Sequence, residues 1–174
     1  MTNRLCQIAL VASVALFLFI VVLNNAVFDY ASNYGFVQHV VSMDTLFSGE
    51  ANAWRAFRDP TPEDGSYWFY HVFYATIIIW EAAAGILCGL GAWQMFQHRG
   101  SARGAFHRAK KFATFGLTLS MLQWFVAFIT VGAEWFLMWQ SSSWNGQDAA
   151  FRMFACLGIM LIFLHLPDGE DESV

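Results

Sequence analysis

Apolar residues form four long stretches along the chain, and shorter polar segments separate them. A helix needs about 20 predominantly apolar residues to cross the hydrocarbon core of a bilayer. The four stretches lie at about 5–28, 68–96, 112–139 and 149–166. The pattern predicts an all-α membrane four-helix bundle. We expect one integral membrane domain over residues 1–174, with an acidic tail at 167–174.

Composition supports the membrane interpretation. Of the 174 residues, 57% are hydrophobic and only 13% are charged, whereas a soluble domain is about 25% charged and about 45–50% apolar. A single buried core cannot absorb that excess, because a domain of this size still exposes much of its surface. The lipid bilayer is therefore the expected surrounding. The net charge of −4 leaves no basic surplus that would indicate a nucleic-acid partner.

The first stretch could be a cleaved signal peptide or a retained membrane anchor. The apolar core of a signal peptide has about 7–15 residues and is followed by small residues at the cleavage site. Here the apolar run is longer and ends in NNAVFDY. We therefore expect a retained first span.

Lysine and arginine positions predict the orientation, because short cytoplasmic loops carry an excess of these residues. The connector QHRGSARGAFHRAKK, between the second and third spans, holds five of them, and Arg4 precedes the first span. The connector at 29–67 holds Arg55 and Arg58 against six acidic residues. The N- and C-termini are therefore expected to be cytoplasmic, with the long first connector outside.

The long first outer loop is expected to contain short amphipathic helices at the membrane surface. Apolar residues recur with helical spacing at Phe36, Val37, Val40, Val41 and Phe47. Asn33 is the expected N-cap of this helix. A second apolar group consists of Ala53, Trp54 and Phe57. The loop could form a lid over the bundle or a docking surface for another membrane protein.

Small and polar residues form one stripe on each of the two central spans. In the second span the stripe comprises His71, Tyr74, Ile78, Glu81, Gly85, Cys88 and Ala92. In the third span it comprises Ala113, Gly116, Ser120, Gln123, Ala127, Thr130 and Glu134. Steps of three and four keep such residues on one helix face. Membrane helices bury small and polar faces against each other, so bulky residues such as Trp124 and Phe128 are expected to face lipid. Gly85 and Gly89 form a spacing that permits close helix approach.

Glu81 is the most unusual residue in these stripes. It lies about 12 residues, or roughly 18 Å, below the outer end of its span, near the bilayer midplane. An ionised carboxylate at that depth is costly, so Glu81 is expected to be neutral or paired. Gln123 reaches the same depth in the third span. We predict a hydrogen bond between the two side chains.

A second charged group is expected at the outer edge of the bundle. Glu134 lies near the end of the third span and Arg152 near the start of the fourth, and only a short link separates these spans. We predict a salt bridge between them, with Asp148 as a competing partner of Arg152. The same level is approached by Asn24, Asn25 and His71. Each polar group can fix helix packing or serve as a proton relay, ion relay or ligand anchor.

Motifs of well-known chemistry are missing from the sequence. No nucleotide-binding loop, nucleophile elbow or H-E-x-x-H zinc motif occurs. A haem held by two histidines is not expected, because His71 lies near the outer face and His165 near the inner face. Cys6, Cys88 and Cys156 all fall within spans, without metal-binding spacing. We therefore expect no catalytic residue, no metal and no cofactor.

Four segments carry a family resemblance: NNAVFDYASNYGFVQHVVSMDT, WEAAAGILCGLGAW, FGLTLS and GAEWFLMWQSSSWNGQDAAFR. Together they resemble an uncharacterised bacterial family of predicted small integral membrane proteins with four spans. The resemblance covers nearly the whole chain, implies a location in the bacterial inner membrane, and brings no established activity. The family's motif positions in this sequence include Asn24, Asp29, His39, Asp44, Glu81, Glu134, Trp139, Asn145 and Arg152.

Three classes of function remain. The leading hypothesis is a non-enzymatic accessory or scaffold subunit, partnered by another membrane protein or by a second copy of the chain. The alternative is a small transporter, channel component or proton-linked carrier that uses Glu81 and Gln123, with the Glu134/Arg152 pair as gate. A redox-complex subunit comes third. A water-filled cavity that reaches Glu81 would favour transport, whereas tight, dry packing around it would favour a scaffold.

Overall fold

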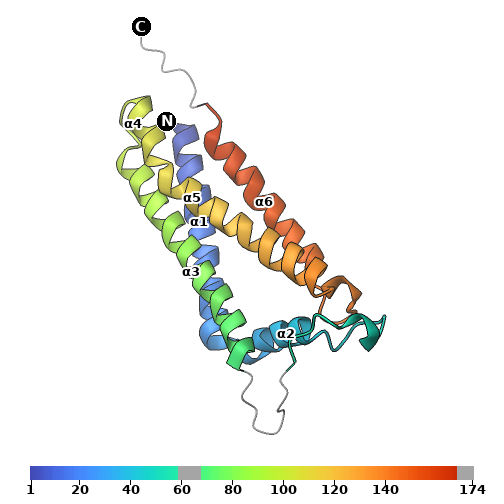
Figure 1. The fold of residues 1–174 in the computed structure, drawn as a ribbon. Coiled ribbons are helices and arrows are strands. Elements are labelled where there is room, and N and C mark those ends of the chain that lie inside the picture. The colour runs from blue at the N-terminus through green and yellow to red at the C-terminus, as the bar shows by residue number, and fades with distance from the viewer. Residues whose placement is uncertain (59–67, 168–174) are drawn as a thin grey trace.

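The computed structural model describes residues 1–58 and 68–167. Four long helical spans cross one another as a bundle (Figure 1). They are α1 (Thr2–Leu23) continued by the π-helix η1 (Asn24–Phe28), α3 (Trp68–Gln97), α5 (Lys111–Leu122) continued by the π-helix η3 (Gln123–Trp135), and α6 (Gln147–His165). All four are long and apolar enough to cross a membrane. The predicted all-helical fold with four spans is confirmed, while the acidic residues 168–174 lie outside the described part.

Within the described residues, four shorter helices lie between the spans: α2 (Tyr30–Ser42), η2 (Glu50–Asn52), α4 (Arg103–Ala109) and η4 (Met138–Gln140). Helix α4 lies at one end of the bundle, and α2 runs across the opposite end, where the spans diverge (Figure 1). Following the predicted topology, we call the α4 end inner and the α2 end outer. Which end faces the cytoplasm stays a prediction.

The amphipathic helix predicted in the outer loop corresponds to α2, whose Val37, Val40 and Val41 are buried. The predicted N-cap is wrong. The helix begins at Tyr30, and the Asn33 side chain lies inside it and donates to the Asp29 carbonyl oxygen at 3.0 Å. Asn33 therefore stabilises the first turn from within rather than capping it.

The second apolar group of the outer loop, Ala53 to Phe57, forms turns rather than a helix. The Ala56 amide donates to the Ala53 carbonyl oxygen at 3.0 Å within a turn, and the Phe57 amide donates to the Val41 carbonyl oxygen at 3.0 Å. The bond to Val41 joins the end of this group to α2.

The inner end is held together by basic side chains bonded to backbone carbonyl groups. Arg4 donates to the carbonyl oxygens of Arg99 at 3.0 Å and Ser101 at 2.6 Å. Lys110 donates to the Leu164 carbonyl oxygen at 2.8 Å. The start of α1, the connector at α4 and the end of α6 are thus bonded at one end. Such bonds satisfy the free carbonyls at helix ends, which hydrocarbon cannot do.

Helix α3 occupies the middle of the bundle, with α1 along one side and α5 along the other, while α6 packs on α5 and η3. A Cβ atom built on Gly91 would lie 2.3 Å from the Ala113 backbone nitrogen, and one on Gly116 would lie 2.6 Å from Cys88 Sγ. The backbones of α3 and α5 are therefore in direct contact. Of the predicted pair, Gly85 approaches Leu18 of α1 closely, whereas Gly89 has room for a side chain.

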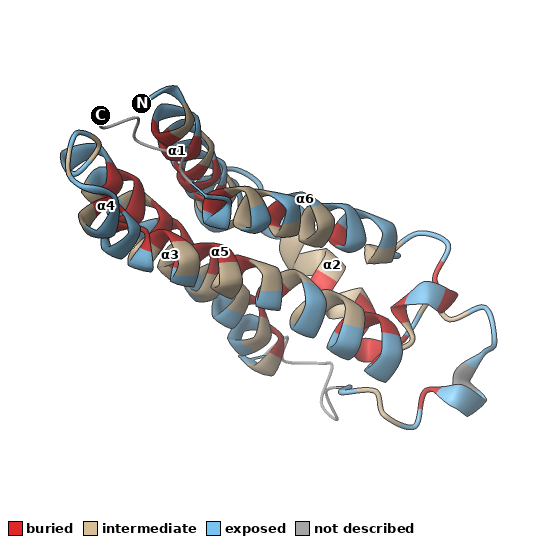
Figure 2. Cartoon of the chain, turned by 90° about the horizontal axis from the view of Figure 1, so that it is seen from above, coloured by how far each residue is buried: buried red, intermediate tan, exposed pale blue. Residues whose placement is uncertain are grey.

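The buried residues form two apolar cores. The inner core joins α1, α3, α4, α5 and α6 around residues such as Leu18, Met95 and Leu117. The outer core joins α2 to the outer halves of α3 and η3 around Val40 and Tyr70. Buried positions face inward between the spans, and the outward faces are exposed (Figure 2). Those outward faces carry large apolar side chains suited to lipid, such as Leu16, Ile79 and Ile162.

Candidate functional site

Glu81 lies between the two apolar cores, where three spans meet. Its side chain is only 3% exposed. Gln123 Nε2 donates to Glu81 Oε1 at 3.1 Å, and Asn25 Nδ2 donates to Glu81 Oε2 at 2.8 Å. The predicted hydrogen bond between Glu81 and Gln123 is confirmed. The bond from Asn25 adds the first span, so one carboxyl group links α3 to both of its neighbours.

Asn24, the asparagine singled out from the family motif, does not take part in this contact. Its side chain is exposed, whereas that of Asn25 is half-buried. The sequence pattern places both asparagines farther out, at the level of Glu134 and Arg152, so the bond from Asn25 to Glu81 was not predicted. The π-helical turn η1 begins at Asn24 and rotates the following residues relative to an α-helix.

Both partners of Glu81 lie where an α-helix changes into a π-helix. Asn25 is the second residue of η1, and Gln123 is the first residue of η3. In a π-helix each hydrogen bond joins residues five apart instead of four, and such turns occur frequently at functional sites. The change of helix type at both positions marks the Glu81 level as a specialised part of the bundle.

The π-helix η3 also corrects the predicted stripe of the third span. Ala113, Gly116, Ser120 and Gln123 are buried as predicted, but Thr130 and Glu134 are exposed. Beyond Gln123 the buried positions are instead Gly132, Ala133 and Phe136. A π-helix has more residues per turn than an α-helix. Residues spaced for one face of an α-helix therefore turn away from the buried face after Gln123.

The predicted salt bridge between Glu134 and Arg152 is wrong. Both side chains are exposed, and the ion pair found within residues 1–58 and 68–167 joins His39 to Asp44 at 2.8 Å. The competing partner Asp148 makes no ion pair in that part of the chain either. Arg55 approaches Glu134 only through the backbone, since its guanidinium lies 3.4 Å from the Glu134 carbonyl oxygen. The π-helical path of η3 changes the direction of the Glu134 side chain and so accounts for the missing pair.

A double-mutant cycle tests this correction. Glu134→Gln and Arg152→Gln are each expected to change the free energy of unfolding by less than about 0.5 kcal/mol, as exposed substitutions usually do. The coupling energy between them should be close to zero, because independent sites add. The measurement is thermal unfolding of the two single variants and the double variant in detergent. A coupling above about 1 kcal/mol would restore the salt bridge.

A cavity of about 310 Å³ reaches Glu81 from the outer half of the bundle. Its wall includes the polar residues Asn25 and Asn33 and the aromatic residues Phe36, Tyr74, Trp124 and Phe128. Tyr74 is buried, and its hydroxyl donates to the Asn25 carbonyl oxygen at 2.8 Å. The expectation that Trp124 and Phe128 face only lipid is therefore wrong, because both line this cavity.

A second cavity, of about 440 Å³, adjoins the first and is almost entirely apolar. Its wall comes from α2, α3, η3 and the residues just after η3. The two cavities share four wall residues, Phe36, Val37, Ile77 and Phe128. A largely apolar cavity that includes the Glu81 carboxyl group and two asparagines in its wall thus lies beside a larger cavity that is almost entirely apolar.

His71 belongs to an aromatic cluster above this site rather than to the Glu81 contact. Its Nδ1 lies 2.7 Å from the Tyr30 hydroxyl oxygen, and its ring stacks on Tyr34 with centroids 4.4 Å apart. The side chain itself is exposed. The cluster connects the beginning of α2 to α3 and positions α2 over the cavities.

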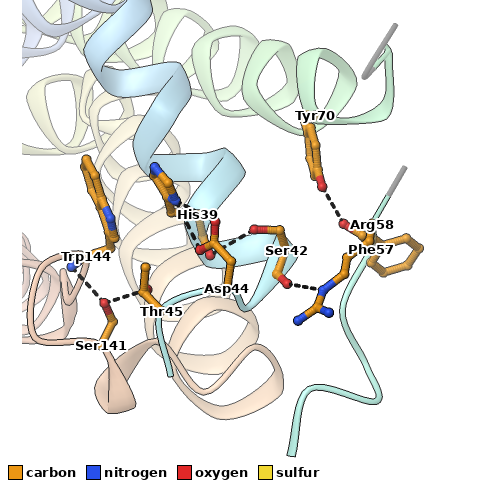
Figure 3. Close-up of polar contacts among 9 residues, drawn as sticks. All are labelled: His39, Ser42, Asp44, Thr45, Phe57, Arg58, Tyr70, Ser141 and Trp144. Carbon is orange, nitrogen blue, oxygen red and sulfur yellow. Dashed lines mark hydrogen bonds and ion pairs between the residues drawn. The ribbon is translucent and has the colours of Figure 1, made fainter. Parts of the chain in front are cut away.

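The outer end is closed by contacts among α2, the residues just after α2 and the segment after η3 (Figure 3). The His39 ring bonds to Asp44 and stacks on Trp144 with centroids 4.6 Å apart. Thr45 and Trp144 share the Ser141 hydroxyl, at 2.9 and 3.0 Å. We call this group of contacts the outer cap. It holds α2 in place as one wall of both cavities.

In the part of the chain that the structure describes, no three His, Cys, Asp or Glu side chains lie close enough together to hold a metal ion. Glu81 is bonded to amides, and His39 pairs with a single carboxylate. The Glu81 site therefore provides a carboxyl group that is held by two hydrogen bonds and lies beside a cavity.

Comparison with known proteins gives one match. A family model described as a predicted small integral membrane protein (DUF2165) matches residues 3–167. No curated protein and no solved structure matches the chain.

Proposed function

The chain belongs to the family of predicted small integral membrane proteins (DUF2165), and on that premise we propose that it is a non-enzymatic carrier, or part of one, that binds its substrate at Glu81. The coarse description, a multi-pass integral membrane protein, follows from the family and from the four apolar spans. A location in the bacterial inner membrane stays a prediction from the resemblance.

The observation that carries the proposal is the cavity that ends at Glu81. An ionisable group inside a membrane marks substrate or ion pathways by default. A purely structural Glu81 would be surrounded by packed side chains, as Ala84 and Cys88 are, one and two turns away on the inner side. The open volume beside Glu81 therefore favours the carrier over the scaffold.

The packing differs between the two halves of the bundle in the way a carrier requires. On the inner side of Glu81, α3 and α5 are in backbone contact at Gly116 and Gly91. On the outer side the spans diverge beneath α2 (Figure 1). This conformation would receive a substrate from the outer half and block its exit toward the inner half. A carrier then needs a second conformation that opens the inner side.

Thiol labelling from each side of the membrane tests for that second conformation. In a background with Cys6→Ser, Cys88→Ala and Cys156→Ser, one cysteine is introduced at Ile77, on the cavity wall one turn from Glu81. The control position is Ala84, which is completely buried in the inner core. Sealed vesicles of each orientation are treated with a membrane-impermeant thiol reagent.

We expect the cysteine at position 77 to react from both sides, at different rates, and the cysteine at position 84 to react from neither. Reaction from both sides reports alternating access to the same cavity. Reaction at position 77 from one side only would contradict the carrier, because the cavity would then never open inward. Unequal rates would also give the ratio of the two conformations.

The accessory or scaffold subunit remains a second candidate, supported by the outer surface. Phe47 and Trp54 are 73% and 77% exposed, and Trp135 and Trp139 are also exposed at this end. Arg55 lies against Trp54 and Trp135, with its guanidinium 5.2 and 5.3 Å from the ring centroids. Such a surface suits the membrane interface as well as another membrane protein or a second copy. Cross-linking from position 54 would separate lipid contact from protein contact.

A further inference from the structure

Glu81 has no cationic partner within the described residues. Its two carboxyl oxygens accept hydrogen bonds from the neutral amides of Asn25 and Gln123, and the ion pair found in that part of the chain lies elsewhere, at His39. Two amide bonds leave about half of the four lone-pair positions of a carboxylate unused. A buried carboxylate without a counter-charge is costly in a membrane. A bound cationic group would supply the counter-charge that an ionised Glu81 lacks.

The wall beside Glu81 consists largely of aromatic rings. Phe36, Tyr74, Trp124 and Phe128 all line the cavity that reaches the carboxyl group. Trp124 and Phe128 lie 4.8 Å apart by ring centroids, and both come from η3. Aromatic faces attract positive charge, and groups of such rings recognise substituted ammonium ions. The same rings would gain nothing from an anion, which Glu81 would also repel.

The adjoining cavity determines what the rest of the ligand looks like. It is larger than the first and lined by residues such as Val40, Val72 and Val131, with almost no polar surface. The two cavities share Ile77 and Phe128 as a common wall, so a ligand that extends past these residues would reach both. A small inorganic cation would leave this apolar volume empty. A cation that carries a hydrophobic group fills both compartments.

From this charge and shape we infer that the Glu81 site takes a lipophilic organic cation, such as a substituted ammonium ion with an aryl or alkyl group. The ammonium group lies against Glu81 between the aromatic rings, and the hydrophobic group lies in the apolar cavity beneath α2. This inference rests on the proposed carrier function, for which it supplies the substrate class. It assigns Glu81 the role of counter-charge and Trp124 that of an aromatic wall.

The test compares two probes of the same shape that differ in charge. Benzyltrimethylammonium carries the positive charge, and neopentylbenzene is its neutral carbon isostere. Binding of each is measured by calorimetry on the full chain in lipid nanodiscs, with empty nanodiscs as the blank. Because both probes offer the same hydrophobic area, a difference in affinity reports the contribution of the charge.

We expect saturable binding of one cation per chain and at least about tenfold weaker binding of the isostere. Glu81→Gln, which keeps the size of the side chain, should weaken binding of the cation at least about tenfold and leave that of the isostere unchanged. The control Glu134→Gln removes an exposed carboxylate of the third span and should leave both affinities unchanged. Equal affinities for the two probes in the wild-type protein would overturn the inference, whatever the fate of the variants.

The outcomes also distinguish this inference from the carrier proposal. Labelling of position 77 from both sides, without binding of the cation, would support a carrier and refute the organic-cation class. Binding of the cation that depends on Glu81, with labelling from one side only, would support the site and refute the carrier.

Discussion

Gly91→Ala is expected to leave only a small fraction of the protein folded. The added methyl group would lie 2.3 Å from the Ala113 backbone nitrogen and 2.6 Å from its Cα atom. Backbone atoms cannot turn aside as a flexible side chain can, so α3 and α5 would have to separate. Overpacking of a tight core costs about 1–3 kcal/mol and sometimes more. We expect a loss of at least about 3 kcal/mol, at the upper end of that range.

Gly89→Ala is the matched control for this prediction. It adds the same methyl group to the same helix two residues away, where the nearest atom outside the helix, Phe19 Cε2, lies 3.9 Å from the new Cβ. Replacing glycine by alanine inside a helix otherwise favours the helix by about 0.5–1 kcal/mol. Thermal unfolding of both variants, followed by size-exclusion chromatography in detergent, measures the difference. Equal melting temperatures for Gly91→Ala and the wild type would show that α3 and α5 are not in backbone contact.

Glu81→Ala is expected to destabilise the bundle strongly. Asn25 and Gln123 would both lose their hydrogen-bond acceptor, and Gln123 is completely buried. A buried donor left without a partner costs about 1–3 kcal/mol. We therefore expect a loss of about 2–4 kcal/mol in the free energy of unfolding, including the effect of the enlarged cavity.

Glu81→Gln should be milder, because its amide oxygen can still accept one of the two bonds. The expected loss is about 1 kcal/mol. Glu134→Ala serves as the control for removal of a carboxylate, and its exposed side chain makes an effect below about 0.5 kcal/mol the expected result. Thermal unfolding of the three variants gives the ranking. If Glu81→Ala were as stable as Glu134→Ala, the two amide bonds would not stabilise the junction of the spans.

The fold could be predicted from the sequence because hydrocarbon imposes simple rules. Four apolar stretches of sufficient length predicted the four spans. The spacing of small and polar residues along α3 predicted most of its buried face, although His71 is exposed and Ile78 is only half-buried. The bond between Glu81 and Gln123 followed from their depths alone. Depth depends on the rise of a helix per residue, which varies little along a regular helix.

The outer half could not be predicted in the same way, because it departs from the α-helix. Thirteen residues of η3 follow a π-helical path, and side chains beyond Gln123 turn away from the positions that an α-helical stripe gives them. This single change exposed Glu134, placed Trp124 in a cavity wall and removed the expected salt bridge. The choice of Asn25 over Asn24 has the same origin in η1. No residue pattern in these segments indicates a π-helix.

The cavities could not be predicted from the sequence for a different reason. They lie between elements far apart in the chain, namely α2, α3 and η3. Their size depends on how far the spans diverge beneath α2, which the outer cap controls through contacts such as that of His39 with Trp144. A sequence shows which residues are apolar, but it does not show where packing leaves space.

Labelling of Glu81 by a lipophilic carbodiimide tests the central claim most directly, namely that an open cavity reaches this carboxyl group. N,N′-Dicyclohexylcarbodiimide enters membranes and adds to carboxyl groups that it can reach, which increases the peptide mass by one reagent molecule. Purified protein in lipid is treated with the reagent and digested, and the modified positions are identified by mass spectrometry. We predict an adduct on Glu81 that benzyltrimethylammonium suppresses. An unmodified Glu81 in folded protein, under conditions where Glu134 reacts, would contradict the account.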